Sequence, residues 1–386
     1  MRYYNIDDVD LAGKRVLVRI DVNSPVKNKK IIGLERIQEH SVTIKHLTKK
    51  RAKSVLISYQ GRKGEKDFIS LKQHARYLSK FCKKTIIFVE DITGKKAIEK
   101  IKSLKNGDVL LLENSRFLEE ENDSKAKKKV LVKTLAPLFD YFIFDAFSVA
   151  HRDIPSVTGF GKRLPVIAGR AMEKELKGLE KIKNVKRPYV FLLGGGKIDD
   201  CVLLIEKRLR DVDYVLCGGK IGIAGLISQG YKIEAVDGYF PFLKRIKRFV
   251  NNKKLILPID FATRINGKRR EFSTNKFSKG HPALDIGSKT IDKYKKILLR
   301  AKTVYIKGPM GFYEQKGFEK GEKILLKTIA RSKAFSIAGG GHTANAIDMF
   351  INRKKISYFS LSGGALLEYI AGKELPGLKI LKKVKR

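Results

Sequence analysis

The chain has 386 residues, of which 43% are hydrophobic, and it carries a formal net charge of +42. This length and apolar content predict about two domains, each with its own core. A polar, acidic start (MRYYNIDDVD), apolar runs far short of the ~20 residues that cross a bilayer, and an odd number of cysteines argue against export, a membrane partner and a disulfide framework. We therefore expect a cytoplasmic protein with reduced thiols.

In the first half, short β-rich runs alternate with helical patterns. The predicted strands are RVLVRID, SVLISY, TIIFV, DVLLLEN and YFIFDAF, and the predicted helices between them span 35–50, 70–82, 95–104 and 124–135. This alternation predicts a parallel sheet covered by helices on both faces. Ligands of such sheets bind beyond the carboxyl ends of the strands, so the residues that follow each strand are the candidates for a site.

Arginine recurs after these predicted strands. Arg36, Arg62, Arg116 and Arg152 each follow a different strand. The guanidinium group is a rigid fork of donors that suits carboxylate and phosphate. A surface ion pair is the usual role of any one arginine, but four of them at one edge of a sheet predict a basic cup for a small polyanion.

The pattern changes in the middle of the chain. Residues 164–182 (LPVIAGRAMEKELKGLEKI) predict a connector with one long amphipathic helix, and residues 185–188 break it. We therefore expect a first domain at 1–168, an interdomain helix at 169–184 and a second domain at 185–368.

Glycine takes the place of arginine at the strand ends of the second half. Residues 187–205 (RPYVFLLGGGKIDDCVLLI) read as strand, glycine turn and helix. Glycines let the backbone approach a ligand and leave its N–H groups, the positive end of the helix and Lys197 for an anion such as phosphate. A tight turn with a solvated lysine is the structural alternative. The same signature recurs in YVLCGGK, TVYIKGPMG and AFSIAGGGHT, the last of which opens into a helix predicted at 343–350.

Backbone amides at several strand ends suit a polyphosphate, so the second half is predicted to bind a nucleotide. The expected fold class is α/β, with two doubly wound, parallel-sheet, Rossmann-like domains joined by a hinge helix. A domain that holds a small acid and a domain that holds a nucleotide predict phosphoryl transfer between them, a reaction that needs alignment and positive charge more than covalent chemistry. Lys197 and Arg36 are the candidates for that charge.

Ten motifs carry a resemblance to a known family over essentially the whole chain. In order they are DVNSP, SYQGR, ENSRF, DAFSVAHR, AGRAMEKEL, LGGGK, DIGSKT, KGPMGFYE, GGGHT and GKELPG. With these motifs the chain resembles the phosphoglycerate kinase family, and RIQEH, YQGR and KIDDC look closer to its archaeal branch. The resemblance implies reversible phosphoryl transfer between 1,3-bisphosphoglycerate and ADP, giving 3-phosphoglycerate and ATP, with Mg²⁺ as cofactor.

The resemblance also implies site residues by position. The substrate 3-phosphoglycerate would be bound by Asp21, Asn23, Arg36, Tyr59, Gln60, Gly61, Arg62, Arg116 and Arg152. The nucleotide, ATP or ADP, would be bound by Lys197, Glu314 (through the ribose), Gly340, Gly341, His342 and Thr343. Arg36 and Lys197 would be the catalytic residues. The C-terminal segment 369–386 would return to complete the first domain.

Four positions depart from the family pattern. Tyr59 stands where the family usually has a substrate-binding histidine, and Cys201 where most members have a second phosphate-binding lysine. Lys307 replaces an asparagine. His342 replaces the aspartate that is associated with the metal, and because imidazole is a poor ligand for Mg²⁺, no metal ligand is assigned. These departures bear on the efficiency of catalysis more than on its class.

Other functions are also compatible with the sequence. The net charge suggests nucleic-acid binding, but lysines are spread through nearly every predicted helix without a basic arm or an RNA motif, which favours a solvated surface with incidental, salt-sensitive binding at most. A non-catalytic descendant that acts as a basic RNA-binding or scaffold protein is the main alternative, and a kinase for a different small acid is a third. Retention of Lys197 and the arginines favours the enzyme.

Overall fold

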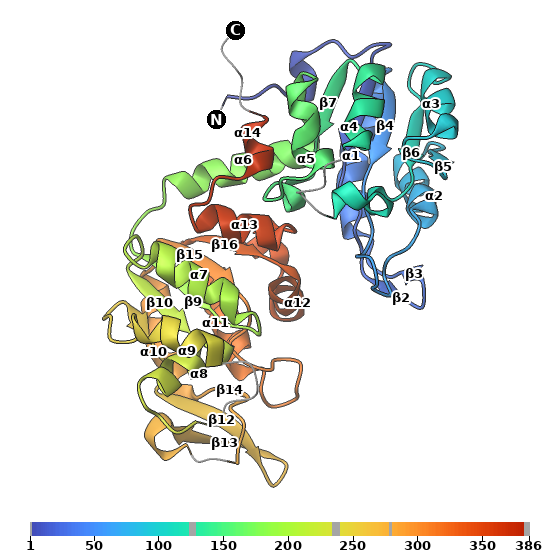
Figure 1. Ribbon diagram of the computed structural model, residues 1–386. Coiled ribbons are helices and arrows are strands. Elements are labelled where there is room, and N and C mark those ends of the chain that lie inside the picture. Colours follow the sequence, from blue (N-terminus) through green and yellow to red (C-terminus); the bar gives the residue numbers. More distant parts are fainter. Residues whose placement is uncertain (1, 123–128, 234–239, 278–279, 382–386) are drawn as a thin grey trace. The chain divides into compact units, whose positions relative to one another are not determined.

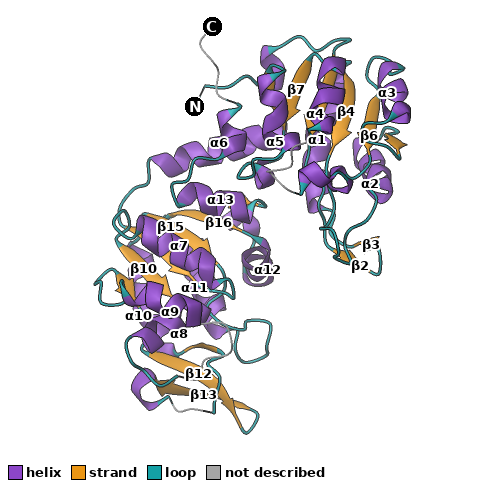
Figure 2. Cartoon of the chain, in the orientation of Figure 1, coloured by secondary structure: helices purple, strands orange, loops and turns teal. Residues whose placement is uncertain are grey.

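The computed structural model describes residues 2–122, 129–233, 240–277 and 280–381, and the chain divides into two compact units (Figure 1). Unit 1 comprises Met1–Glu180 and Glu374–Arg386, and unit 2 comprises Lys181–Lys373. Each unit is organised around its own parallel β-sheet with helices packed beside it (Figure 2). The predicted α/β fold with two parallel sheets is confirmed.

The sheet of unit 1 has six parallel strands in the order β5-β6-β4-β1-β7-β8. Its strands are β1 (Arg15–Arg19), β4 (Lys53–Ile57), β5 (Ile87–Val89), β6 (Val109–Leu112), β7 (Tyr141–Phe144) and β8 (Val166–Ala168), and a hairpin is formed by β2 (Val26–Lys27) and β3 (Lys30–Ile31). The helices are α1 (Glu35–Lys49), α2 (Lys72–Cys82), α3 (Lys95–Lys102), α4 (Val130–Leu135), α5 (Pro155–Thr158), α6 (Arg170–Lys183) and α14 (Pro376–Lys379).

Continuous apolar runs explain these central strands. Val16, Leu17 and Val18 in β1 are all fully buried, as expected for a strand that is covered by helices on both faces. Such a strand places its carboxyl end, not its faces, within reach of a ligand.

The sheet of unit 2 also has six parallel strands, in the order β11-β10-β9-β15-β16-β17. Its strands are β9 (Tyr189–Leu193), β10 (Tyr214–Cys217), β11 (Leu255–Ile256), β15 (Thr303–Lys307), β16 (Phe335–Gly339) and β17 (Tyr358–Ser360). The helices are α7 (Ile198–Arg208), α8 (Gly219–Ser228), α9 (Phe240–Lys247), α10 (Ser288–Arg300), α11 (Lys320–Arg331), α12 (Gly341–Phe350) and α13 (Gly363–Ile370). Short 3₁₀ helices lie at Ile6–Asp8, Ser115–Phe117, Glu119–Glu121, Ala136–Leu138, Phe147–Val149, Gly159–Lys162, Thr274–Lys276 and Arg353–Lys355.

Unit 2 also contains a small antiparallel sheet that was not predicted. Its order is β13-β12-β14, with β12 (Asp260–Ile265), β13 (Lys268–Ser273) and β14 (Asp285–Ile286). Asn266 and Gly267 join β12 to β13 with φ angles of 48° and 73°, as a two-residue hairpin turn requires.

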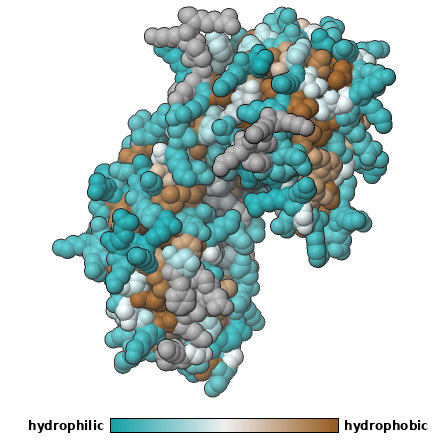
Figure 3. Space-filling model, in the orientation of Figure 1, coloured by the Kyte–Doolittle hydropathy of each residue, from teal (hydrophilic) through white to brown (hydrophobic). Residues whose placement is uncertain are grey.

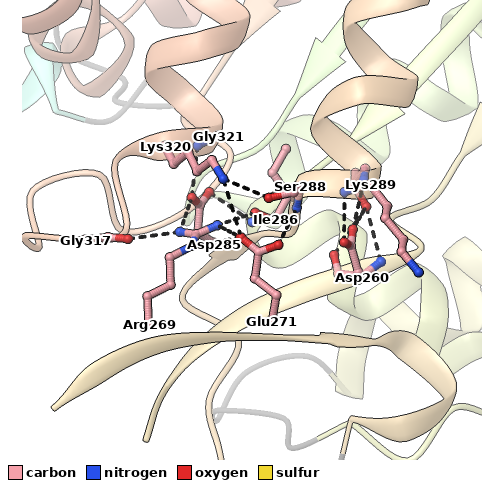
Figure 4. Close-up of polar contacts among 11 residues, drawn as sticks. Asp260, Arg269, Glu271, Asp285, Ile286, Ser288, Lys289, Gly317, Lys320 and Gly321 are labelled. Atoms are coloured by element: carbon pink, nitrogen blue, oxygen red, sulfur yellow. Dashed lines mark hydrogen bonds and ion pairs between the residues drawn. The ribbon is translucent and has the colours of Figure 1, made fainter.

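Acidic side chains fasten this small sheet to two helices, as Figure 4 shows. Asp260 accepts hydrogen bonds from the amides of Lys289 (2.9 Å) and Thr290 (2.8 Å) at the start of α10. Asp285 accepts from the Gly321 amide at the start of α11 (2.9 Å) and from the Arg269 guanidinium (2.9 Å). Because α11 also contacts the loop after β15, the small sheet helps to fix one wall of the glycine-rich region described below.

The C-terminal part of the described chain packs on unit 1. The Gly377 amide in α14 donates to the Ala150 carbonyl at 2.8 Å, and a Cβ at this glycine would lie 2.7 Å from the Phe144 ring. Of the predicted segment 369–386, residues 369–373 group with unit 2 and residues 382–386 lie outside the described residues.

Two predicted helix boundaries differ from the structure. The helix expected at 124–135 is described only as α4, since residues 123–128 lie outside the described residues. Helix α12 begins at Gly341, two residues before the predicted start at Thr343, because Gly340 takes a φ of 97° and serves as its N-cap. Among the described residues no helix is long and apolar enough to span a membrane. The face drawn in Figure 3 is mostly hydrophilic, in agreement with the predicted lysine-rich surface.

Candidate active site

Three of the four arginines that were predicted to form a basic cup line an open cavity of unit 1, whereas Arg36 is not among the lining residues and pairs with Asp21. Arg62, Arg116 and Arg152 line a cavity of ≈ 620 Å³ together with Asn23, Tyr59 and Gly61. The same three arginines line an adjoining cavity of ≈ 530 Å³ that also includes His151. Burial lowers the pKa of the Arg116 guanidinium, and neighbouring cationic side chains lower it further. The cavity therefore concentrates positive charge, which suits a small polyanion.

Tyr59 lies close to two of the cationic groups. Its ring is 3.7 Å from the guanidinium carbon of Arg116 and 5.1 Å from that of Arg19, and the residue is only 5% exposed. These distances are those of cation–π contacts. Tyr59, predicted as a substrate-binding residue, therefore lines the cavity and also helps to hold Arg116.

Asp21 and Arg36 form an ion pair at the end of β1. Asp21 also accepts a hydrogen bond from the Ser148 hydroxyl and one from the Asn23 amide (3.0 Å). Asp21 is almost fully buried, and these contacts orient Arg36 and Asn23. Asn23 in turn accepts from the Gly61 amide at 2.9 Å, so the loops after β1 and β4 are joined directly.

Gln60 directly precedes the cavity residues Gly61 and Arg62 and is fully buried. Its side chain accepts from the Ser24 amide (2.8 Å) and donates to the carbonyls of Ser24 (3.0 Å) and Asp67 (3.3 Å). His74 also contacts its side-chain oxygen at 3.1 Å, and burial lowers the pKa of this imidazole to about 4. The structure thus places Gln60 where it supports the loop that carries Gly61 and Arg62.

Sequence reasoning missed several buried groups that support the cup. Arg19 is fully buried within β1 and donates to the Ser156 hydroxyl at 3.2 Å. Glu121 accepts from the Ser156 amide at 2.7 Å and from the Ser115 hydroxyl at 3.1 Å, and burial raises the pKa of this carboxyl. The available signal was a charged residue at the end of an otherwise apolar run, RVLVR.

In unit 2, the first glycines of the GGGK turn are used to build the turn. The Gly194 amide donates to the Lys307 carbonyl (2.8 Å) and the Gly195 amide to the Pro309 carbonyl (2.6 Å). We expected these amides to be left for an anion, and for these two glycines that expectation is wrong. Gly196 and Lys197, in contrast, are exposed at the start of α7. The second half of the turn is therefore the part that is accessible to a ligand.

The loop after β15 connects the glycine turns to one another. The Gly308 amide donates to the Thr343 hydroxyl (3.0 Å), and the Met310 carbonyl accepts from the Gly219 amide (2.7 Å). The Met310 amide donates to the Glu322 carboxyl at 2.9 Å. Glu322 is buried, and burial raises its pKa to about 8. The predicted nucleotide ligand Thr343 is itself 2% exposed, so its hydroxyl holds this loop.

Three further predicted nucleotide residues are accessible. Gly341 and His342 lie exposed in the first turn of α12, and Glu314 lies exposed in the loop that follows β15. The His342 carbonyl accepts from the hydroxyl of Tyr313 at 3.4 Å, which ties α12 to that loop. Gly340 allows the sharp entry into α12 through its positive φ.

Two of the four positions that depart from the family pattern, Lys307 and Cys201, lie beside the GGGK turn. The Lys307 ammonium is 2.9 Å from the Asp200 carboxylate, and the Cys201 thiol donates to the Gly194 carbonyl at 3.5 Å. Burial raises the pKa of Cys201 to about 12, so this thiol is neutral at physiological pH. Within the described part of the chain, no group of three or more His, Cys, Asp or Glu side chains is placed to hold a metal ion.

Comparison with known proteins gives a consistent result over the whole chain. The family model for phosphoglycerate kinase matches residues 6–373. The phosphoglycerate kinases of Methanobacterium bryantii and Sulfolobus acidocaldarius are 40% and 41% identical to it, over 99% and 97% of this chain and 98% and 95% of theirs. The crystal structure of phosphoglycerate kinase from Pyrococcus horikoshii OT3 superposes with a TM-score of 0.88 at 34% identity, covering 98% of both chains.

These relatives are archaeal, as the details of the motifs predicted, and none of the matches supports the RNA-binding or scaffold alternative. The fold, the arginine-lined cavity and the glycine-rich turns agree with the same assignment. The chain belongs to the phosphoglycerate kinase family, and it transfers a phosphoryl group between 1,3-bisphosphoglycerate and ADP, giving 3-phosphoglycerate and ATP.

Proposed function

We propose that the arginine-lined cavity of unit 1 binds 3-phosphoglycerate and its acyl phosphate. The supporting observation is that Arg62, Arg116 and Arg152, which come from three different strand ends, line one cavity. Asn23 and Gly61 contribute to the same wall, and their mutual hydrogen bond fixes its shape. Guanidinium groups at three positions can contact both the carboxylate and the phosphate of a small acid.

The glycine-rich region of unit 2 is proposed to bind ATP or ADP. Lys197, Gly341 and His342 are exposed at the starts of α7 and α12, where helix N-termini favour phosphate. Glu314 is proposed to contact the ribose. Gly340 and Thr343 act by shaping the turn that presents these groups.

Lys197 and Arg36 are proposed to neutralise the phosphoryl group during transfer. Arg36 is oriented by its ion pair with Asp21, and Lys197 follows the glycine turn on α7. Fixed positive groups of this kind stabilise the charge that develops on the transferring group without reorganising at the moment of reaction.

Mg²⁺ is proposed to enter as part of the nucleotide substrate. Mg²⁺ keeps several waters and is commonly held by phosphate oxygens with one or two protein carboxylates. The described residues do not supply a ready ligand set, and His342 stands at the position of the family's aspartate. The metal is therefore assigned to the phosphates, and no ligand from the chain is named.

The domain roles follow from these sites. We assign the phosphoglycerate to residues 1–168 with the C-terminal segment from residue 374, the nucleotide to residues 185–368, and the hinge to 169–184, which contains all of α6. The small-molecule chemistry fits an enzyme that works in the cytoplasm.

A coupled assay tests the assignment of both substrates. Purified protein with ATP, Mg²⁺ and 3-phosphoglycerate is expected to form ADP, and omission of the acid is expected to abolish the reaction. Arg62→Ala and Arg116→Ala should each raise KM for 3-phosphoglycerate, because each loses a charge-assisted contact of about 1.5 to 3 kcal/mol. An unchanged KM in both variants, or faster turnover with a different small acid, would place the acid site elsewhere or change its ligand.

A further inference from the structure

Lys307 lies at the centre of the glycine-rich region. It is the last residue of β15, and β15 pairs with β9 on one side and β16 on the other. The GGGK turn follows β9 and the GGGHT turn follows β16, so the end of β15 lies between them. The Lys307 carbonyl accepts the Gly194 amide at 2.8 Å, which places this residue directly against the first of these turns.

The Lys307 side chain is directed to the start of α7. Its ammonium pairs with Asp200 at 2.9 Å, and the side chains of Lys307 and Asp200 are 15% and 30% exposed. An ammonium has three N–H donors, and this contact with Asp200 takes one of them. Lys307 can therefore keep its pair with Asp200 and still donate to an anion at the same turn.

The acidic residues at the start of α7 explain why the Lys307 ammonium would affect the binding of an anion at this turn. Asp199 and Asp200 both lie in the first turn of α7 and together outweigh the single positive charge of Lys197. The neighbouring Cys201 thiol is neutral and adds no charge. Arg245 lies 3.9 Å from the Asp199 carboxylate and offsets part of its charge, whereas Lys307 is the cation that pairs with Asp200 where a polyphosphate would approach.

We propose that Lys307 is a phosphate-binding residue of the nucleotide site, and that Asp200 partly neutralises its charge and so tunes the affinity for nucleotide. This inference rests on the proposed location of the nucleotide in unit 2. The opposing interpretation is an ion pair that only joins β15 to α7.

The first test compares substitutions at Lys307 in the full-length protein. Lys307→Met is expected to raise Kd for ATP, measured by titration calorimetry, by about tenfold or more, because a charge-assisted hydrogen bond to phosphate is lost. Lys307→Arg keeps the positive charge and should recover most of the affinity. KM for 3-phosphoglycerate should change by less than about twofold in both variants.

The second test changes Asp200, the partner of Lys307, and the expected change in Kd for ATP has the opposite sign. Asp200→Asn should lower Kd for ATP by about two- to fivefold, the worth of a partly exposed ion pair. In a Lys307→Met background the same change should have much less effect, since the two residues are coupled. Asp199→Asn is the matched control. It removes the same charge from the same turn. Its side chain is 72% exposed and pairs with Arg245 at 3.9 Å, so the change should act equally in both backgrounds.

A purely structural ion pair gives a different result. Asp200→Asn and Lys307→Met would then lower the thermal stability by similar amounts, and neither would change Kd for ATP in the folded protein. If Lys197→Ala loses turnover while Lys307→Met keeps normal ATP affinity, Lys307 is not a phosphate ligand but the nucleotide site is correctly placed. If Lys197→Ala also keeps full turnover, the proposed nucleotide site itself is wrong.

Discussion

Tyr59 lines the arginine-rich cavity and also contacts two of the arginines. Its ring is within cation–π distance of the guanidinium groups of Arg19, which is fully buried, and Arg116, which lines the cavity. The negative face of an aromatic ring attracts such cations, so the ring helps to hold Arg116 at the cavity. A tyrosine at the family's histidine position is thus compatible with substrate binding through Arg116.

Two substitutions of Tyr59 distinguish the role of its ring from the role of its hydroxyl. Tyr59→Phe keeps both cation–π contacts, so KM for 3-phosphoglycerate should change by less than about twofold. Tyr59→Leu loses the contact with Arg116, worth about 0.5 to 2 kcal/mol, so KM should rise about 2- to 30-fold. Steady-state kinetics of the two variants measure this difference, and an equal loss in Tyr59→Phe would make the hydroxyl a substrate ligand instead.

Site residues with strong local signals were predictable, and those defined by distant partners were not. Arg62, Arg116 and Arg152 were predicted because each follows an apolar strand, and they line one cavity. The use of the Gly194 and Gly195 amides was not predictable, since their acceptors lie more than a hundred residues away in sequence at Lys307 and Pro309. Local sequence shows that a turn is glycine-rich, but only the tertiary structure shows which amides remain for a ligand.

Adjacent glycines of the same turn should therefore respond differently to alanine. A Cβ at Gly194 would lie 2.2 Å from the Pro309 carbonyl oxygen, whereas a Cβ at Gly196 would meet nothing within 4 Å. Gly194→Ala should cost about 1 to 3 kcal/mol of unfolding free energy, because the backbone has to shift. Gly196→Ala is the control and should change stability by less than about 0.5 kcal/mol. Urea unfolding of both variants checks this, and similar values would contradict the proposed packing of the turn.

At the scale of elements, the loop after β15 contacts several parts of the proposed nucleotide site. Residues 308–311 bond to the GGGK turn, to Gly219 and to Thr343, and Glu322 on α11 holds the loop from below through the Met310 amide. The other carboxyl oxygen of Glu322 is buried with no hydrogen-bond partner in the described structure. A buried carboxyl in this state is more stable when it is protonated.

Protonation of Glu322 predicts a pH dependence of stability. Burial raises its pKa from 4.5 to about 8 in the folded chain, so between these values the folded state binds a proton that the unfolded state has lost. The contribution of Glu322 to the free energy of unfolding therefore falls as pH rises from about 4.5 to about 8. Glu322→Gln should remove this contribution and flatten the profile.

Denaturant unfolding at several pH values measures this effect. The difference in unfolding free energy between the wild type and Glu322→Gln should shift in favour of the variant as pH rises from 5 to 8, whereas Glu119→Gln, on the surface, should give a constant difference. Parallel profiles for the wild type and Glu322→Gln would show that Glu322 is ionised in the folded chain. Asp285, whose pKa burial raises to about 6, acts in the same direction over a narrower range and is common to both proteins.

Most strands of the parallel sheets were predicted, whereas the short strands β8, β11 and β17 and the small antiparallel sheet were not. The run YVFLL is apolar throughout and RVLVR has an apolar centre between two arginines, and both became buried strands. In β13 the residues are mostly exposed and charged (KRREFS), so an apolar pattern is missing. The Asn266–Gly267 pair was the local signal for this hairpin.

At the scale of the whole molecule, the proposed substrate sites belong to different units. Direct transfer requires the two units to enclose both substrates and to exclude water. Small-angle scattering should therefore show the smallest radius of gyration when 3-phosphoglycerate and nucleotide are present together. Identical profiles with and without the two ligands would argue against a hinge in residues 169–184.

The proposed mechanism of phosphoryl transfer depends most directly on the positive charge that Lys197 is proposed to bring to the transferring group. Lys197→Ala should lower kcat by about 100-fold or more and change Kd for ATP by less than about threefold, because this contact strengthens only in the transition state. The decisive measurement is kcat together with Kd for ATP on the same preparation of this variant. A large loss of kcat with nearly normal ATP binding would support the proposed role of Lys197 in the transition state. An unchanged kcat, or an equal loss of kcat and ATP affinity, would contradict it.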